Sequence, residues 1–133
     1  MASDLAFAML TRNFATRHAA AGAPTWFYRF DLGGLLLGPT HGVELAYLWG
    51  WRGLRTMLGT GGPMIGKRAR LARRMRRAWI DFIRNGDPGP RWPRFQADAQ
   101  QILLLDAEDS VAPDPDAERR RLWAGRDVLV RTR

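Results

Sequence analysis

Apolar side chains recur at helical spacing in the most basic part of the chain. Six of them fall within an arc of about 140° when each residue turns the helix by about 100°: Leu71, Met75, Ala78, Trp79, Phe82 and Ile83. Most of the arginines and Asp81 fall on the opposite side. The pattern predicts an amphipathic helix over residues 67–84, which ends where Asn85 and Gly86 open a loop rich in glycine and proline.

Two short apolar runs predict β-strands. Residues 25–30 are rich in β-formers at both odd and even positions, which is typical of a parallel-type strand covered on both faces. Residues 102–105 form the second run, and because polar residues flank it we expect this strand at an edge of the sheet. A polar stretch rich in aspartate and proline follows and is interpreted as a connection to the last helix.

Three more helices are predicted around these runs. The first covers residues 3–22 and opens on a serine-aspartate pair that suits a helix cap, the second covers residues 43–49, and the third covers residues 117–123. Glycines break up the segment 53–66, which is predicted to be a loop region. The order helix, strand, loop, helix, strand, helix is that of an α/β protein.

Composition is that of one ordinary globular domain at most: 133 residues, 46% of them hydrophobic and 26% charged. The chain has no cysteine, which excludes a disulfide framework and a cysteine nucleophile. Its two histidines, His18 and His41, lack the spacing of a metal site, so no metal is expected. No apolar run approaches the roughly 18 residues that cross a bilayer, and the first residues lack a basic leader. We expect a cytoplasmic chain without membrane contact.

The charge is concentrated in one place. Basic residues outnumber acidic ones by 21 to 13, and residues 67–77 alone carry seven cations. Such a helix could neutralise phosphates while nearby tryptophans stack on bases. A small nucleic-acid-binding module that uses the Lys67–Arg77 helix is therefore the alternative hypothesis. Because the arginines lie opposite the apolar stripe, a solvated surface explains them as well, and no specific nucleic acid is expected as a partner.

The most informative segment is Gly-Pro-Thr-His-Gly-Val-Glu-Leu at residues 38–45, a glycine-flanked loop with His41 beyond a predicted buried strand. Loops after parallel strands often carry working groups, and an imidazole there can act as a general base near neutral pH. From the residues alone, a structural histidine that caps the next helix is the other interpretation. His18, beside Arg17 at the polar end of its helix, is interpreted as solvated.

Four ordered motifs resemble the C-terminal portion of the type-B carboxylesterase family, in the α/β-hydrolase superfamily. Residues 23–30 are similar to its "AP-x-x-x-Y-x-F" strand, and residues 38–45 resemble its "GA-x-HG-x-EL" box. Residues 79–88 and 92–95 resemble its "W-x-x-F…G-x-P…WP-x-Y" tail. The resemblance implies a C-terminal fragment of an α/β-hydrolase fold, the last sheet strands with flanking helices, as a single partial domain over residues 1–133.

The resemblance implies hydrolysis of carboxylic esters without a cofactor. It places the general base of a Ser-His-Glu/Asp triad at His41. Ser3 and Ser110 lie outside any G-x-S-x-G elbow, no H-G-G-G-type oxyanion loop occurs, and Glu44 is too close in sequence to orient His41. We therefore expect the isolated chain to be inactive and to act on an ester substrate only with an upstream portion that carries the serine.

A sheet cut in this way is expected to expose surface that a whole sheet would cover. We expect an unpaired strand edge and self-association, with apolar helix faces exposed at Leu5, Phe14, Met75 and Trp79. Four aromatic residues near the second strand are interpreted as core packing rather than as a ligand cage: Trp79, Phe82, Trp92 and Phe95.

Overall fold

The structure is a computed structural model that describes three stretches of the chain: residues 8–32, 42–50 and 66–123. Within them, three strands form one sheet in the order β1 (Tyr28–Phe30), β2 (Gln101–Leu105) and β3 (Ser110–Pro113). β1 runs parallel to β2, with Tyr28 opposite Leu103. β3 runs antiparallel to β2, with Ala112 opposite Ile102. The small mixed sheet confirms the α/β class.

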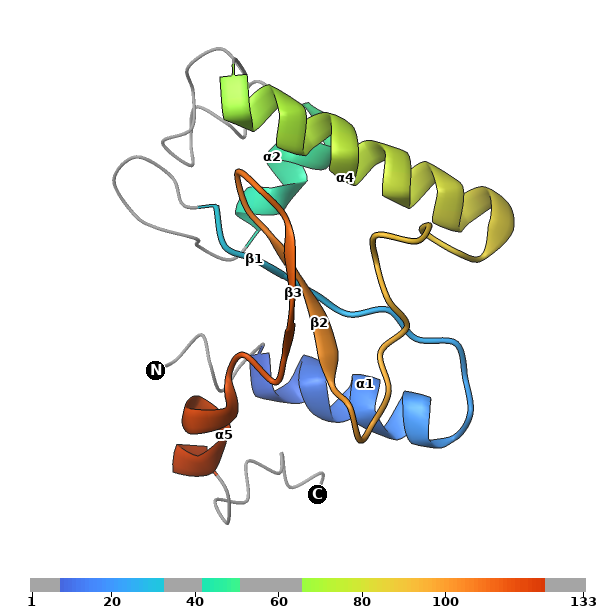
Figure 1. Ribbon diagram of the computed structural model, residues 1–133, viewed down its shortest axis with the longest axis vertical. Helices are drawn as coiled ribbons and strands as arrows, with labels where there is room; N and C mark the ends of the chain where they lie inside the picture. The colour runs from blue at the N-terminus through green and yellow to red at the C-terminus, as the bar shows by residue number, and fades with distance from the viewer. Residues whose placement is uncertain (1–7, 33–41, 51–65, 124–133) are drawn as a thin grey trace, which may run out of the picture.

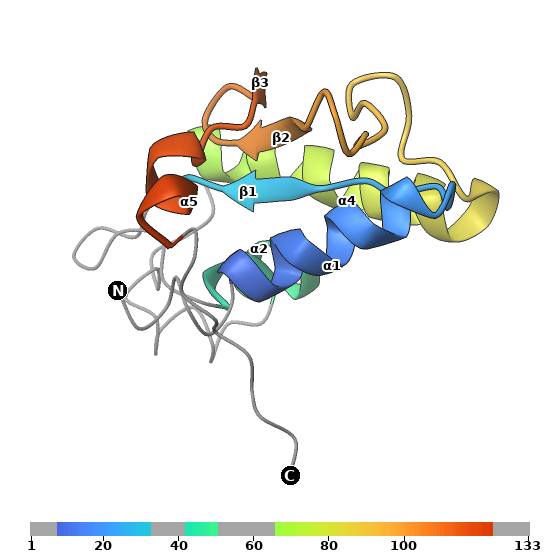
Figure 2. The ribbon, with the colours of Figure 1, turned by 90° about the horizontal axis from the view of Figure 1, so that it is seen from below.

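Helices lie on both sides of this sheet. Figure 1 shows α2 (Val43–Trp49) and α4 (Gly66–Asn85) above the strands, and α1 (Met9–Ala20) and α5 (Ala117–Trp123) below them. In Figure 2, seen from below, α4 lies behind the strands. The bounds of α4 exceed the predicted 67–84 by one residue at each end, and the predicted helices over 43–49 and 117–123 are confirmed.

Alternate side chains of the strands enter two different cores. Leu103 and Leu105 belong to the larger core with Tyr47 of α2 and Leu71 of α4. Ile102 belongs to a smaller core on the α1 side. Neighbouring residues around β1 follow the same alternation, because Tyr28 and Phe30 pack against the larger core and Phe27 packs against the smaller one. The prediction of a strand covered on both faces is thus confirmed.

The predicted edge position of residues 102–105 is wrong, because β2 is the central strand. The stretch that was interpreted as a connection turns back at residues 106–109 and forms β3. Ser110–Pro113 is mostly exposed and lacks an apolar alternation, so its pattern carried no strand signal. Backbone pairing with β2 gives it its structure instead.

The predicted exposure of helix faces is only partly correct. Phe14 is 69% exposed, as expected, but Met75 is 1% exposed and lies in the larger core. Trp79 is half-buried against that same core. Leu5 and the predicted helix cap at residues 3–4 lie outside the described residues.

Arg12 of α1 is buried beneath the sheet and joins the two ends of the β2–β3 hairpin. Its Nη2 donates to Gln100 Oε1 at 2.5 Å and to Asp114 Oδ1. Gln100 and Asp114 both have positive φ, 47° and 39°, and the Asp114 N–H donates to Gln100 O at 3.0 Å. Burial lowers the pKa of Arg12 from its ordinary value, and the charge of Asp114 opposes this effect.

Candidate functional site

His41, the general base implied by the resemblance, lies outside the described residues, so its role stays a prediction. The nearest described residues along the chain are Leu32, just after β1, and Gly42, just before α2. The structure therefore describes the two flanks of the candidate site.

The first flank is the carboxyl end of β1. The N–H groups of Asp31 and Leu32 both donate to Leu105 O, at 2.9 and 3.2 Å. Arg29 donates to both carboxylate oxygens of Asp31, at 2.7 and 2.8 Å, and to Asp116 Oδ1 at 2.8 Å. These bonds to Asp31, ahead of a smaller opposing effect of burial, raise the pKa of Arg29. Backbone pairing and charge-assisted bonds together hold this strand end.

The second flank is the start of α2. Gly42 has φ +81°, and a Cβ there would meet only Leu45 Cδ1 at 4.0 Å. Backbone conformation rather than lack of space therefore favours glycine after the histidine. Gly42 O accepts the N–H of Leu45 at 3.2 Å, and Val43, the first helical residue, is 1% exposed. Glu44 stands in the first turn, as expected of a carboxylate at a helix start.

Tyr28, the first residue of β1, senses the charge of Glu44 at the start of α2. Burial raises the pKa of Tyr28 to about 12, and the negative charge of Glu44 adds to the shift. The ring of Tyr28 packs edge-on against Trp92, with centroids 5.4 Å apart. Trp92 Nε1 donates to Phe27 O at 3.2 Å. Tyr28 therefore stays protonated at neutral pH.

The carboxyl ends of β1 and β2 lie at the same end of the sheet, because the two strands are parallel. The turn that follows it, residues 106–109, is held by Arg74 of α4. Arg74 donates to the two oxygens of Asp109 at 2.6 and 2.7 Å and to Asp106 O at 2.8 Å. The bonds to Asp109 raise the pKa of Arg74. One of the seven cations of residues 67–77 thus has a structural partner.

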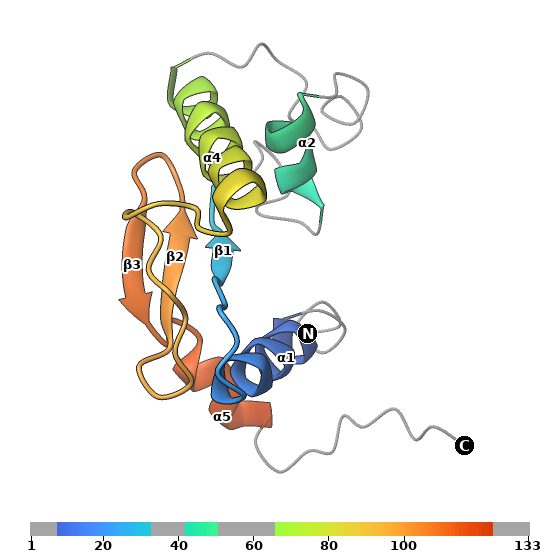
Figure 3. The same ribbon diagram turned by 90° about the vertical axis from the view of Figure 1, so that its right-hand side faces the viewer.

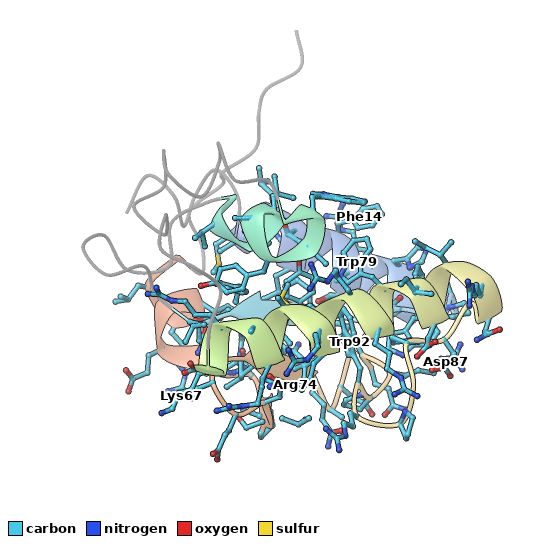
Figure 4. The ribbon with its side chains drawn as sticks, turned by 90° about the horizontal axis from the view of Figure 1, so that it is seen from above. Phe14, Lys67, Arg74, Trp79, Asp87 and Trp92 are labelled. Carbon is cyan, nitrogen blue, oxygen red and sulfur yellow. The ribbon has the colours of Figure 1, made fainter. Side chains whose placement is uncertain are left out.

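The other six cations of residues 67–77 are exposed or, in the case of Arg68, half-buried. Arg77 Nε lies 3.9 Å from Asp81 Oδ2, and the Arg77 side chain is 88% exposed. A groove of about 460 Å³ runs between α4 and the β2–β3 turn, with Lys67, Arg70 and Arg91 among its lining residues. Figure 4 shows Lys67 and Arg74 on α4.

His18 is not merely solvated, although it is exposed. Its Nδ1 lies 2.8 Å from Thr25 Oγ1, and its ring stacks on Phe14 with centroids 5.6 Å apart. Thr25 Oγ1 donates in turn to Ala23 O at 3.0 Å. The imidazole therefore joins the end of α1 to the chain that leads into β1, a structural role.

The four aromatic residues do not form a cage. Trp92 lies in the larger core and Phe95 in the smaller one, on opposite faces of the sheet. Core packing is therefore confirmed for these two. Phe82 is 42% exposed and packs edge-on against Trp26, so it is only partly in the core.

Sequence reasoning missed the long-range ion pairs that hold these flanks. Arg29 and Asp116 are 87 residues apart, and Arg74 and Asp109 are 35 residues apart. Such pairs leave no periodic signal in a single sequence. Within the described stretches, no three histidine, aspartate or glutamate side chains gather in a way that could hold a metal ion. No helix in those stretches has the length and apolar character needed to span a bilayer.

Comparison with known proteins decides the family. The model of the carboxylesterase family matches residues 1–123. The chain belongs to this family.

Individual esterases agree with the family match. The para-nitrobenzyl esterase of Bacillus subtilis is 29% identical over an alignment of 111 residues, and the match covers 74% of this chain and 21% of that protein. Carboxylesterase 5A of Canis lupus familiaris is 28% identical over an alignment of 128 residues, and the match covers 87% of this chain and 22% of that protein. A carboxylesterase structure from Geobacillus stearothermophilus matches with a TM-score of 0.67 and 28% identity, over 82% of this chain and 24% of that one.

This carboxylesterase-family chain thus spans about a fifth of the length of the curated relatives it matches. It shares part of the α/β-hydrolase fold of the solved esterases. These matches give no support to the nucleic-acid alternative built on the Lys67–Arg77 helix.

Proposed function

We propose that this chain is the part of a carboxylic ester hydrolase that supplies the general base, His41. The family match over residues 1–123 carries the proposal. The motif around His41 and the carboxylesterases among its relatives support it.

Ester hydrolysis by this mechanism needs a nucleophilic serine, and neither serine of this chain lies in a G-x-S-x-G elbow. The serine comes from a second portion that also carries the oxyanion donors, and residues 1–133 form a partial domain that completes it. In this scheme the imidazole of His41 takes the serine proton as the hydroxyl attacks the ester carbonyl, and returns that proton to the leaving alcohol. No cofactor takes part.

The described flanks suit such a role. A general base must be held in place to act, and the chain on either side of residues 33–41 is anchored by the bonds to Leu105 O and by the buried start of α2.

Co-expression with the serine-bearing portion of a carboxylesterase tests the proposal. We expect the pair to hydrolyse p-nitrophenyl acetate and the chain alone to be no faster than its His41→Ala variant. In the pair, His41→Ala should lower kcat by at least about 10³-fold. His18→Ala is the matched control and should retain activity, because His18 bonds Thr25 instead.

A pair that keeps its activity with His41→Ala would contradict the proposal. So would an isolated chain whose hydrolysis of the ester is abolished by that substitution, because the chain would then hold its own nucleophile. The self-association expected of the isolated chain stays a prediction that sedimentation measures.

A further inference from the structure

A basic groove and an apolar cavity meet beside α4. The groove between α4 and the β2–β3 turn has a volume of about 460 Å³. A second cavity, of about 450 Å³, is lined by α4, β2 and the loop 88–92. Four residues line both spaces: Arg74, Arg91, Leu103 and Asp109. The two spaces are therefore neighbours.

Both spaces lie apart from the described flanks of His41. Among the described residues, none from α1, α2 or β1 lines either of them. Figure 3 shows β3, β2 and β1 from left to right, with α4 above the strands and with α2 and α1 to the right of β1. A ligand in the groove and the cavity would therefore leave these flanks free.

The groove carries an excess of positive charge. Arg74 is held by Asp109, at 2.6 Å. Among the other described lining residues, Glu108 is the one carboxylate. Three exposed cations of the lining form no ion pair with any described residue: Lys67, Arg70 and Arg91. Guanidinium groups bind carboxylates and phosphates through paired hydrogen bonds, so this surface suits an anion.

The second cavity has apolar walls. Met75 of α4, Trp92 of the loop and Leu105 of β2 line it, and all three belong to the larger core. Figure 4 shows Trp92 on the same side of α4 as Lys67 and Arg74. Apolar walls beside a few charged groups are typical of small-molecule sites, whose volumes are about 300–1,000 Å³.

We propose that the groove and the cavity together bind a small amphipathic anion, of the class of alkyl carboxylates. Its acidic head lies at Arg70 and Arg91, and its apolar body lies against Trp92 and Leu105. Arg91 lines both spaces, so its guanidinium can hold the head while the body enters the cavity. An inorganic anion would leave the apolar walls uncovered, and a neutral apolar ligand would leave the cations unpaired. The inference is independent of the proposed function.

Calorimetric titration of the 133-residue chain with octanoate tests the proposal. We expect saturable binding at a single site. Acetate keeps the head and lacks the body, whereas octan-1-ol keeps the body and lacks the charge, so each should bind at least about ten-fold more weakly. Octan-1-ol that binds as tightly as octanoate would indicate adsorption to exposed apolar surface and would overturn the proposal. Acetate that binds as tightly as octanoate would also overturn it.

Two arginines of α4 provide matched variants. Arg70 and Arg73 are both exposed, but only Arg70 lines the groove. Arg70→Met should weaken octanoate binding about ten-fold and Arg73→Met less than about two-fold, with unchanged far-ultraviolet circular dichroism for both. Arg91→Met, on a different element, should act as Arg70→Met does. Equal effects of Arg70→Met and Arg73→Met would show a diffuse effect of charge and contradict the site.

A lipid surface is the other source of an acidic head with an apolar body. Vesicles of phosphatidylglycerol should not sediment the chain at physiological salt, where charges on an open surface are screened. Sedimentation with these vesicles that Arg70→Met abolishes would replace the free anion with a membrane and overturn the proposal. All of these readouts are binding, so the result for His41 in ester hydrolysis leaves them unaffected.

Discussion

The helices α4 and α1 sort their side chains in opposite ways. α4 buries Leu71 and Met75 and turns its arginines to the surface, as an amphipathic helix does. α1 buries Arg12, at 3% exposure, and leaves Phe14 exposed. α2 and the sheet cover Leu71 and Met75 of α4. On α1 the small Ala15 is buried in the smaller core, whereas the larger Leu10 and Phe14 stay exposed. Within the part of the chain that the structure describes, α1 thus keeps an exposed apolar surface at Leu10 and Phe14.

The buried charge of α1 is tolerated because it is paired. A buried guanidinium is costly unless hydrogen bonds and an opposite charge compensate for it. Gln100 and Asp114 supply both for Arg12, and Arg120 shares Asp114 from α5. The α1 side of the sheet therefore combines a small apolar core with a charge network around Arg12.

The largest expected effect on stability comes from removing a side chain of the larger core. Leu71→Ala should lower the free energy of unfolding by about 3 kcal/mol, because Leu71 is 0% exposed in the larger core. Phe14→Ala, which removes a larger but exposed side chain, should change it by less than about 0.5 kcal/mol. Urea denaturation measures both values. Similar losses for the two variants would show that α1 packs as α4 does.

The next effect concerns the buried charge. Arg12→Met should lower the free energy of unfolding by about 2 kcal/mol, because Gln100 and Asp114 lose a donor at the hairpin ends. The loss is limited because Asp114 keeps Arg120. Arg77→Met, on the exposed face of α4, should cost less than about 0.5 kcal/mol. Equal thermal midpoints for these two variants would argue against a charge network beneath the sheet.

The smallest expected effect is a pH dependence of the free energy of unfolding, caused by Tyr28, which packs against the larger core. The pKa of Tyr28 is raised to about 12 in the folded chain from its ordinary value of 10.0, first by burial and then by Glu44. The unfolded chain thus loses this proton first, so stability is fully present below pH 10.0 and falls as the pH rises toward about 12. With allowance for solvent screening, the loss at pH 11 should be about 1 kcal/mol.

Tyr28→Phe provides the control for this titration. The variant should lose less stability than the wild type between pH 9 and pH 11 in the same urea titration, because its ring cannot ionise. An identical decline in both proteins would assign the effect to other groups.

Much of the fold follows from local patterns in the sequence. The apolar stripe of α4 predicted its position to within one residue at each end, because a 20-residue helix repeats its signal over several turns. The run 25–30 correctly predicted a strand covered on both faces, although only Tyr28–Phe30 pairs with a neighbouring strand. The motif residues around His41 indicated the family that the comparisons then showed.

Other features were decided only by the tertiary structure. β2 is central because the polar segment after it folds back and pairs with it as β3. This pairing depends on backbone hydrogen bonds, which leave no side-chain pattern in the sequence. Thr25, the partner of His18, comes within hydrogen-bonding distance only after the chain turns at residues 21–24. The sequence alone therefore predicted a solvated His18.

The sequence by itself determined the α/β class, the positions of the main helices and the candidate base His41, since these depend on spacing within a few residues or on short motifs. The tertiary structure alone decided that α1 buries Arg12 and exposes Phe14, and that β2 rather than β1 is the central strand among the described residues. The physical reason is distance along the chain. Arg12 and Asp114 are 102 residues apart. The ion pair that compensates for burying the Arg12 guanidinium therefore forms only after folding has brought the two side chains together.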